Sequence, residues 1–209
     1  FMFTLKNNFK ITHFVLLVSV LNFLFFHLPF YVFVFNNVDY KSFNGMMIII
    51  SLMILMVVLN AFVFFLIFSL SRHVGKFLLV LFFIVNALAV YFINTYSVII
   101  DESMIGNVLN TKYEEASSFF SIKLFAYIIF LGIIPSIYFI KAKITKVPLK
   151  KFFITISLTL LFVLTLVFAN ASNWLWIDKN SKTLGGLAMP WSYSVNLSLF
   201  YVHQYKKNQ

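Results

Sequence analysis

The chain of 209 residues contains no cysteine, which excludes disulfide bonds, thiolate zinc sites and cysteine nucleophiles. It also has little charge, since 11% of its residues are charged and 62% are hydrophobic, with a mean hydropathy of +0.96. A soluble domain of this size needs more polar residues than this to cover its surface. The composition therefore places the protein in the membrane class.

Five apolar runs are long enough for the roughly 20 residues of helix that cross a bilayer. Apart from Lys123 near an edge, none of them contains Asp, Glu, Lys or Arg. They cover residues 11–35, 46–70, 77–100, 122–140 and 152–169. We therefore predict an all-α membrane protein. Its residues 1–170 form five transmembrane helices with short interfacial helices between them, and residues 171–209 form an interfacial, bridging segment.

The few acidic residues all lie on one side of these predicted spans: Asp39, Asp101, Glu102, Glu114, Glu115 and Asp178. The segments on the other side have no acid and nine basic residues: Lys6, Lys10, Arg72, Lys76, Lys141, Lys143, Lys146, Lys150 and Lys151. Because Lys and Arg mark the cytoplasmic side, we predict a cytoplasmic amino terminus and a carboxyl terminus outside. The net charge of +10 then indicates anchoring to anionic lipid rather than nucleic-acid binding.

The segment between the third and fourth runs, residues 101–121, holds four of the six acids. Its apolar residues recur at helical spacing and predict a short amphipathic helix in the membrane plane: Met104, Ile105, Val108 and Leu109. Thr111 followed by Glu114 has capping-box spacing, which predicts a second helix that runs into the fourth span. Glu114 and Glu115 then have two readings. They are either ordinary first-turn acids of that helix or ligands of a lipid head group.

Several residues inside the runs also carry predictions. Gly132 and Pro135 predict a kink in the fourth span, and a further helix is expected from Pro190 to Lys207. No histidine has a second metal ligand three or four residues away, so no metal site is expected within this chain. Four asparagines interrupt the first three runs and are predicted to hydrogen-bond between helices: Asn22, Asn60, Asn86 and Asn94.

One spaced pattern runs through the loop and consists of Tyr96, Asp101, Met104, Ile105, Asn107, Val108, Leu109, Thr111, Glu115 and Ala116. It resembles the phosphoethanolamine transferases that modify lipid A in Gram-negative bacteria, the colistin-resistance transferases among them. The resemblance extends upstream to Asn86 and, more weakly, over residues 179–201, so that it covers essentially the whole chain. One departure is Ser181, which stands where the family often has a histidine.

The resemblance implies an inner-membrane domain with a cytoplasmic amino terminus and a periplasmic carboxyl terminus. The family moves phosphoethanolamine from phosphatidylethanolamine to lipid A or a related acceptor, through a threonine nucleophile and zinc held by a periplasmic catalytic domain. Neither the nucleophile nor the zinc ligands of that domain are found in these 209 residues. The chain is therefore expected to be the amino-terminal membrane domain, inactive alone and without catalytic or metal-binding residues.

By the same resemblance, Asn107 is expected to donate to a phosphate oxygen of the lipid head group, and Glu115 to pair with its ammonium. Tyr96 and Thr111 are further candidates for head-group binding. Two alternatives remain open at this stage, namely a small transporter and a non-catalytic membrane anchor. A transporter would need ionisable residues at mid-membrane depth, and the runs have none.

Overall fold

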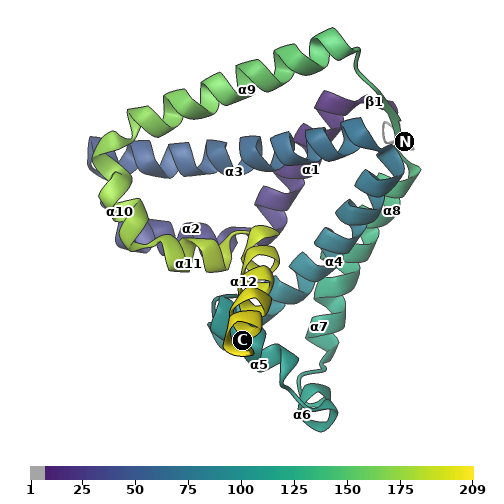
Figure 1. The fold of residues 1–209 in the computed structure, drawn as a ribbon, viewed down its shortest axis with the longest axis vertical. Helices are drawn as coiled ribbons and strands as arrows, with labels where there is room; N and C mark the ends of the chain where they lie inside the picture. The colour runs from purple at the N-terminus through teal and green to yellow at the C-terminus, as the bar shows by residue number, and fades with distance from the viewer. Residues whose placement is uncertain (1–7) are drawn as a thin grey trace, which may run out of the picture.

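The computed structural model describes residues 8–209, which are almost entirely helical (Figure 1). Lys6, assigned above to the basic side, lies outside these residues. The membrane-embedded and connecting elements up to β2 are β1 (Asn8–Lys10), α1 (Ile11–Phe26), α2 (Leu28–Asn37), α3 (Phe43–Leu70), α4 (Arg72–Tyr96), α5 (Glu102–Leu109), α6 (Tyr113–Ser117), α7 (Ile122–Tyr127), the π-helix η1 (Ile128–Ile133), α8 (Ile134–Lys141) and β2 (Lys143–Thr145). They are followed by α9 (Leu149–Ala169), the short 3-10 helix η2 (Ala171–Asn173), α10 (Trp174–Lys179), α11 (Ser181–Leu187) and α12 (Trp191–Lys207).

Four helical segments are long and apolar enough to cross a membrane: α3, α4, the continuous stretch from α7 to α8, and α9. The first predicted span is broken, because α1 and α2 meet at a bend of 66°. His27 lies at the break and Pro29 follows in the first turn of α2, where its missing N–H cannot continue the hydrogen bonds of α1. The all-α membrane fold is confirmed, with up to five spans when the bent pair is counted as one.

The third and fourth spans differ in detail from the predicted ranges. α4 begins at Arg72 and ends at Tyr96, where Ser97 adopts a left-handed conformation with φ 53°, so the residues up to 100 are not helical. In the fourth span a π-helical turn precedes Pro135, at the position where the sequence predicts a kink. Gly132 in this turn packs closely on α4, since a Cβ there would lie 3.1 Å from the Cα of Ile84.

Buried polar side chains join the spans to the turn between α11 and α12. The side-chain amide of Asn22 donates to the carbonyl of Met189 (3.1 Å) and accepts from that of Asn86 (2.9 Å). The hydroxyl of Tyr193 donates to the side-chain oxygen of Asn86 (2.6 Å). Nε2 of His27 accepts from the backbone N–H of Met189 (2.9 Å). The predicted bonding of asparagines between helices is thus confirmed, and it fixes the start of α12 against the bundle.

The remaining asparagines follow the same rule to different degrees. Asn60 is buried on α3, where its side chain accepts from the indole of Trp191 on α12. Asn94 is more exposed and donates to the hydroxyl of Tyr127 at 3.2 Å. The asparagines nearest the middle of the spans therefore carry the tertiary connection, and Asn94 makes a peripheral one.

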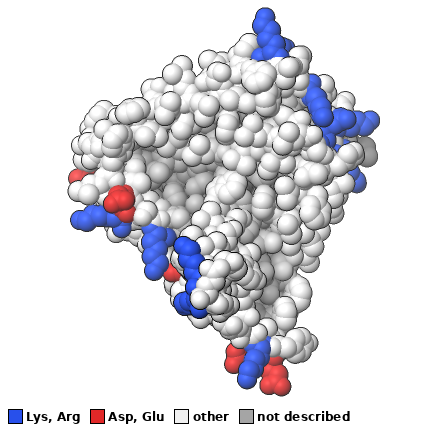
Figure 2. Space-filling model, viewed as in Figure 1, with Lys and Arg blue, Asp and Glu red and all other residues white. Residues whose placement is uncertain are grey.

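The acidic side chains gather at one end of the molecule, whereas basic side chains lie at both ends. Figure 2 shows basic side chains without acids near β1, β2 and the start of α9, and shows acidic and basic side chains together in the region of α6 and α10 at the other end. Helix α9 lies along α3 (Figure 1) and has no buried residue among its 21. The sorting of charge agrees with the sequence pattern, and the exposed α9 leaves grooves between itself and its neighbours.

Candidate functional site

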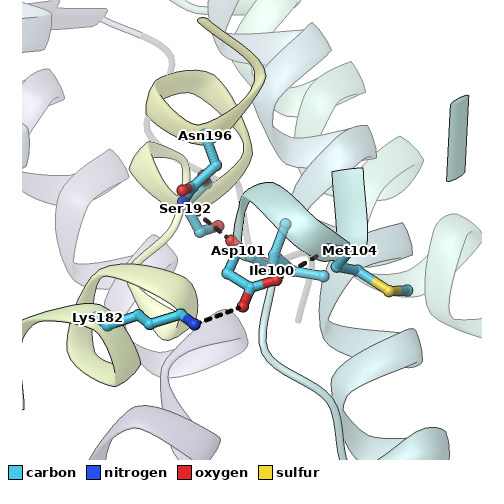
Figure 3. A network of polar contacts seen from close by, with 6 residues as sticks. All are labelled: Ile100, Asp101, Met104, Lys182, Ser192 and Asn196. Carbon is cyan, nitrogen blue, oxygen red and sulfur yellow. Dashed lines mark hydrogen bonds and ion pairs between the residues drawn. The ribbon is translucent and has the colours of Figure 1, made fainter. Parts of the chain in front are cut away.

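The loop after α4 is held against α11 and α12, at the acidic end of the molecule (Figure 3). The backbone N–H of Ile100 donates to the carbonyl of Gly186 (2.9 Å). The side-chain amide of Asn196 donates to the carbonyl of Ile100 (3.1 Å) and to that of Ser192 (2.7 Å). Both backbone groups of Ile100 are therefore bonded to the chain's last third, which places the beginning of α5 beside α12.

Asp101 both starts α5 and links it to α11. Its carboxylate accepts from the backbone N–H of Met104 at 2.9 Å, as a helix N-cap does. The other carboxylate oxygen lies 3.5 Å from Nζ of Lys182 (Figure 3). The side chain of Asp101 is 16% exposed and that of Lys182 is 78% exposed, so the lysine remains available to a ligand in solvent.

A second charged pair joins the far ends of the same helices. Nδ1 of His203 on α12 lies 2.5 Å from a carboxylate oxygen of Glu102 on α5. Between the two pairs, α5, α11 and α12 enclose an open hollow of about 560 Å³. Its walls carry the acids Asp101 and Glu102 together with Lys182 and Lys207. A surface with both signs of charge suits a zwitterionic ligand.

The predicted residues Asn107 and Glu115 are both exposed. Asn107 lies on α5 and Glu115 on α6, and we call these two helices between α4 and α7 the α5–α6 lobe. Among residues 8–209, neither side chain has a hydrogen-bond or ion-pair partner, although the backbone carbonyls of both residues accept side-chain bonds. The carbonyl of Asn107 accepts from the hydroxyl of Thr111 (2.6 Å), and that of Glu115 accepts from the hydroxyl of Ser118 (2.6 Å). The structure thus joins Asn107 and Thr111 directly, and it leaves the two expected ligand groups free.

The predicted capping box is wrong. The N-cap residue of α6 is Lys112, whose side chain makes no capping hydrogen bond. The hydroxyl of Thr111 does not cap α6 either, because it donates back to the carbonyl of Asn107 on α5. The second helix also ends after Ser117, and α7 starts separately with Ser121 as its N-cap, accepting from Leu124. The predicted helix that runs from the loop into the fourth span is therefore two helices with a break between them.

Tyr96 does not line the hollow, and its ring packs against other aromatic rings. Its ring stacks on Phe92 at 5.6 Å and meets Phe119 edge-on at 5.5 Å, which ties the end of α4 to the chain after α6. The ring is 43% exposed. Of the four predicted residues, Tyr96 and Thr111 are accordingly the ones whose side chains contact other residues of the described chain.

Three residues of the hollow were missed in the sequence: Lys182, Asn196 and His203. They lie 81–101 positions after their partners in the loop, and nothing in their local sequence marks them. The hollow holds two acids with one histidine, and within residues 8–209 no group of three or more His, Cys, Asp or Glu side chains is placed to hold a metal ion.

Two adjacent glycines of α11 give a matched test of how the loop is seated. A Cβ on Gly186 would lie 2.9 Å from Cβ of Ile99, whereas a Cβ on Gly185 would meet nothing within 4 Å. We expect Gly186→Ala to push α11 away from the loop and lower the melting temperature in detergent. Gly185→Ala should keep or raise it, because Ala favours helix over Gly by about 1 kcal/mol. Equal melting temperatures for the two variants would contradict the described packing.

Comparison with known proteins agrees with this architecture. The family model of the phosphoethanolamine transferases EptA/EptB matches residues 55–205. Phosphoethanolamine transferase EptA of Helicobacter pylori is 34% identical over 187 residues, which cover 87% of this chain and 34% of that protein. Phosphatidylethanolamine transferase Mcr-2 of Escherichia coli is 34% identical over 73 residues, 35% of this chain and 14% of that one.

The fold is also that of a solved structure. The lipooligosaccharide phosphoethanolamine transferase EptA of Neisseria meningitidis superposes with a TM-score of 0.81 at 18% sequence identity, over 97% of this chain and 38% of its own. This chain therefore spans about a third of the length of the relatives that it matches over most of its own length. By the family model and by its identity to a curated relative, the chain belongs to the phosphoethanolamine transferase EptA/EptB family.

Proposed function

We propose that this chain is the membrane domain of an enzyme that transfers phosphoethanolamine from phosphatidylethanolamine to lipid A or a related acceptor. In this proposal the lobe of α5 and α6, with α11 and α12, binds the head group of the donor lipid. The observation that carries it is the pair of unpartnered side chains of Asn107 and Glu115, on the segment whose first helix, α5, lines a hollow with both signs of charge. An ethanolamine phosphate carries both signs of charge as well.

In this proposal Glu115 and Asn107 bind different groups of the lipid head group. The exposed carboxylate of Glu115 has no partner in the described chain, so it pairs with the ethanolamine ammonium, and a charge-assisted bond of this kind is about twice as strong as a neutral one. The amide of Asn107 donates to a phosphate oxygen. Thr111 holds the carbonyl of Asn107, which orients the end of α5, and Lys182 offers a cation to the phosphate from the neighbouring α11.

The chemical step itself is assigned to residues outside the described ones. In the proposal, zinc and a threonine nucleophile belong to a catalytic domain, and the zinc would activate the threonine and stabilise charge on the transferred group. This membrane domain anchors that machinery and supplies lipid from the outer leaflet. A transporter is disfavoured, because no Asp, Glu, Lys or Arg of the described spans lies near the middle of a span.

The function is tested on lipid A. Cells that express the complete reading frame are expected to contain lipid A with added phosphoethanolamine, detected by mass spectrometry of the extracted lipid. Cells with the empty vector serve as the control. If the protein is present in the inner membrane and the lipid A remains unmodified, the proposed acceptor is wrong.

The orientation is proposed from the sorting of charge, with the basic end in the cytoplasm and the α5–α6 lobe in the periplasm. A phosphatase reporter that is active only in the periplasm should be active when fused after Tyr113 and silent when fused after Lys146. The reverse result would place the lobe in the cytoplasm and exclude its access to a periplasmic head group.

A further inference from the structure

The basic end of the molecule contains a hollow that the proposed transfer does not use. It has a volume of about 310 Å³ and lies where β1, β2 and the start of α9 meet. Its walls include the cations Lys10, Lys146 and Lys151 and the imidazole of His13. The α5–α6 lobe is at the opposite end of the spans, so this hollow is a separate place on the protein (Figure 1).

Pairing of the two short strands gathers these cations. β1 and β2 are parallel, with Lys10 opposite Thr145, and this brings Lys10 next to Lys146 across 136 positions of sequence. Lys151 comes from the first turn of α9. The hollow has no acidic side chain in its wall, and neither does any described segment at this end. Three ammonium groups around one hollow repel one another, and a bound anion offsets that repulsion.

The hollow continues into an apolar groove. Thr12 and Thr155 line both the hollow and a groove of about 270 Å³ that lies between α1, α3 and α9. Apart from Thr159, the other walls of the groove are hydrophobic, with Leu16 of α1, Phe62 of α3 and Leu158 of α9 among them. The groove exists because α9 packs loosely against the bundle, and for the same reason none of its residues is buried.

We propose that the hollow and the groove together bind one anionic phospholipid, with its phosphate against Lys10, Lys146 and Lys151 and an acyl chain between α1, α3 and α9. Basic pockets beside spans on the cytoplasmic side are suited to acidic lipid head groups. Phosphatidylethanolamine fits less well, because its own ammonium would face the three lysines. The site therefore selects a lipid other than the proposed donor, and it does not depend on the proposed transfer.

A larger basic hollow next to it, of about 670 Å³, is less suited to be the primary site. It shares Thr145 and Lys146 with the first. However, its Arg72 donates to the carbonyl of Ile144 (2.9 Å), and its Lys76 donates to that of Ala142 (2.6 Å). These two cations already stabilise the chain after α8, and they contribute positive potential rather than free donors.

The test uses the 209-residue chain purified in detergent and offered equimolar phosphatidylglycerol and phosphatidylethanolamine, with the bound lipid read by native mass spectrometry. We expect one phosphatidylglycerol to be retained, with a preference of about tenfold. The double variant Lys146→Gln/Lys151→Gln should lose most of that preference. Leu158→Trp keeps every charge but fills the groove at an exposed position, and it should lower retention of both lipids.

The matched control is Lys41→Gln/Lys123→Gln, which removes two exposed lysines that line neither this hollow nor the one between α5, α11 and α12, and it should leave the preference unchanged. Melting temperatures of all variants show whether they are folded. Equal retention of the two lipids by the unaltered chain overturns the proposal. An unchanged preference in Lys146→Gln/Lys151→Gln together with unchanged retention in Leu158→Trp also overturns it. Displacement of the lipid by excess inorganic phosphate overturns it as well, because that result would indicate a site for a free anion. These outcomes are independent of whether lipid A is modified.

Discussion

Glu115→Gln in the complete protein is expected to lower the transfer of phosphoethanolamine to lipid A by about tenfold or more, which corresponds to roughly 1.4 kcal/mol of lost transition-state stabilisation. The side chain is exposed and has no partner among the described residues, so its charge is not needed by the fold. The neutral side-chain amide of the introduced glutamine cannot form an ion pair with an ammonium. Asn107→Ala is expected to have an effect of similar size, because it removes the donor to the phosphate. Mass spectrometry of lipid A measures both.

Glu114→Gln is the matched control for this result. Glu114 lies in the same turn of α6, carries the same charge and is also exposed, and it has no capping partner in Thr111. It should therefore change neither activity nor melting temperature appreciably. If Glu115→Gln lowers the melting temperature while the folded protein keeps full activity, then Glu115 supports the helix and does not bind substrate. Equal losses in the two glutamate variants would point to the general negative potential of the lobe.

Asn86→Ala is expected to cause the largest loss of stability, about 2 kcal/mol, because it removes the partner of one buried polar group and the shorter bond of a part-buried one. The first is the side-chain oxygen of Asn22, 2.9 Å from the Asn86 amide. The second is the hydroxyl of Tyr193, which lies 2.6 Å from Asn86 and would keep only a long bond of 3.4 Å to the carbonyl of Phe82. Burial raises the pKa of the Tyr193 phenol, so this hydroxyl keeps its proton and needs an acceptor. A lowered melting temperature in detergent and faster hydrogen exchange in α12 would show both effects.

Asn94→Ala is the comparison for Asn86. It lies on the same helix and is also an asparagine, but it is exposed and makes one bond, to the hydroxyl of Tyr127. A change within about 0.5 kcal/mol is expected there, as for most surface substitutions. Equal and small effects of the two variants would mean that water or lipid satisfies the groups around Asn86, and that the network does not hold α12 in place.

Local chemistry predicted several elements well. The spacing of Met104, Ile105, Val108 and Leu109 predicted α5, which runs from Glu102 to Leu109. Only Ile105 of these is buried, while Val108 and Leu109 are about half exposed, as expected for a helix that covers little of the core. Polar residues inside apolar runs were interpreted correctly at Asn22 and Asn86, because a membrane-buried amide needs a partner on another helix.

Predictions failed where one group had two local partners of similar strength. The hydroxyl of Thr111 can cap the following helix or bond to the carbonyl four residues before it, and the structure has the second arrangement. The break at His27 was missed for a different reason. The run over residues 11–35 is uniformly apolar, and the bend is stabilised by Met189, which is 162 positions away.

The sequence by itself determined the membrane class, the number and approximate ranges of the apolar spans, the sorting of charge and the resemblance carried by the loop from Asp101 to Ala116. These properties depend on composition and on spacing within about 20 residues, which is the length of one span. The tertiary structure alone decided that Asp101 faces Lys182, that Glu102 faces His203, and that Lys10 and Lys146 line one hollow. Each pair joins residues 81–136 positions apart, and their approach depends on how helices and strands pack rather than on any local preference.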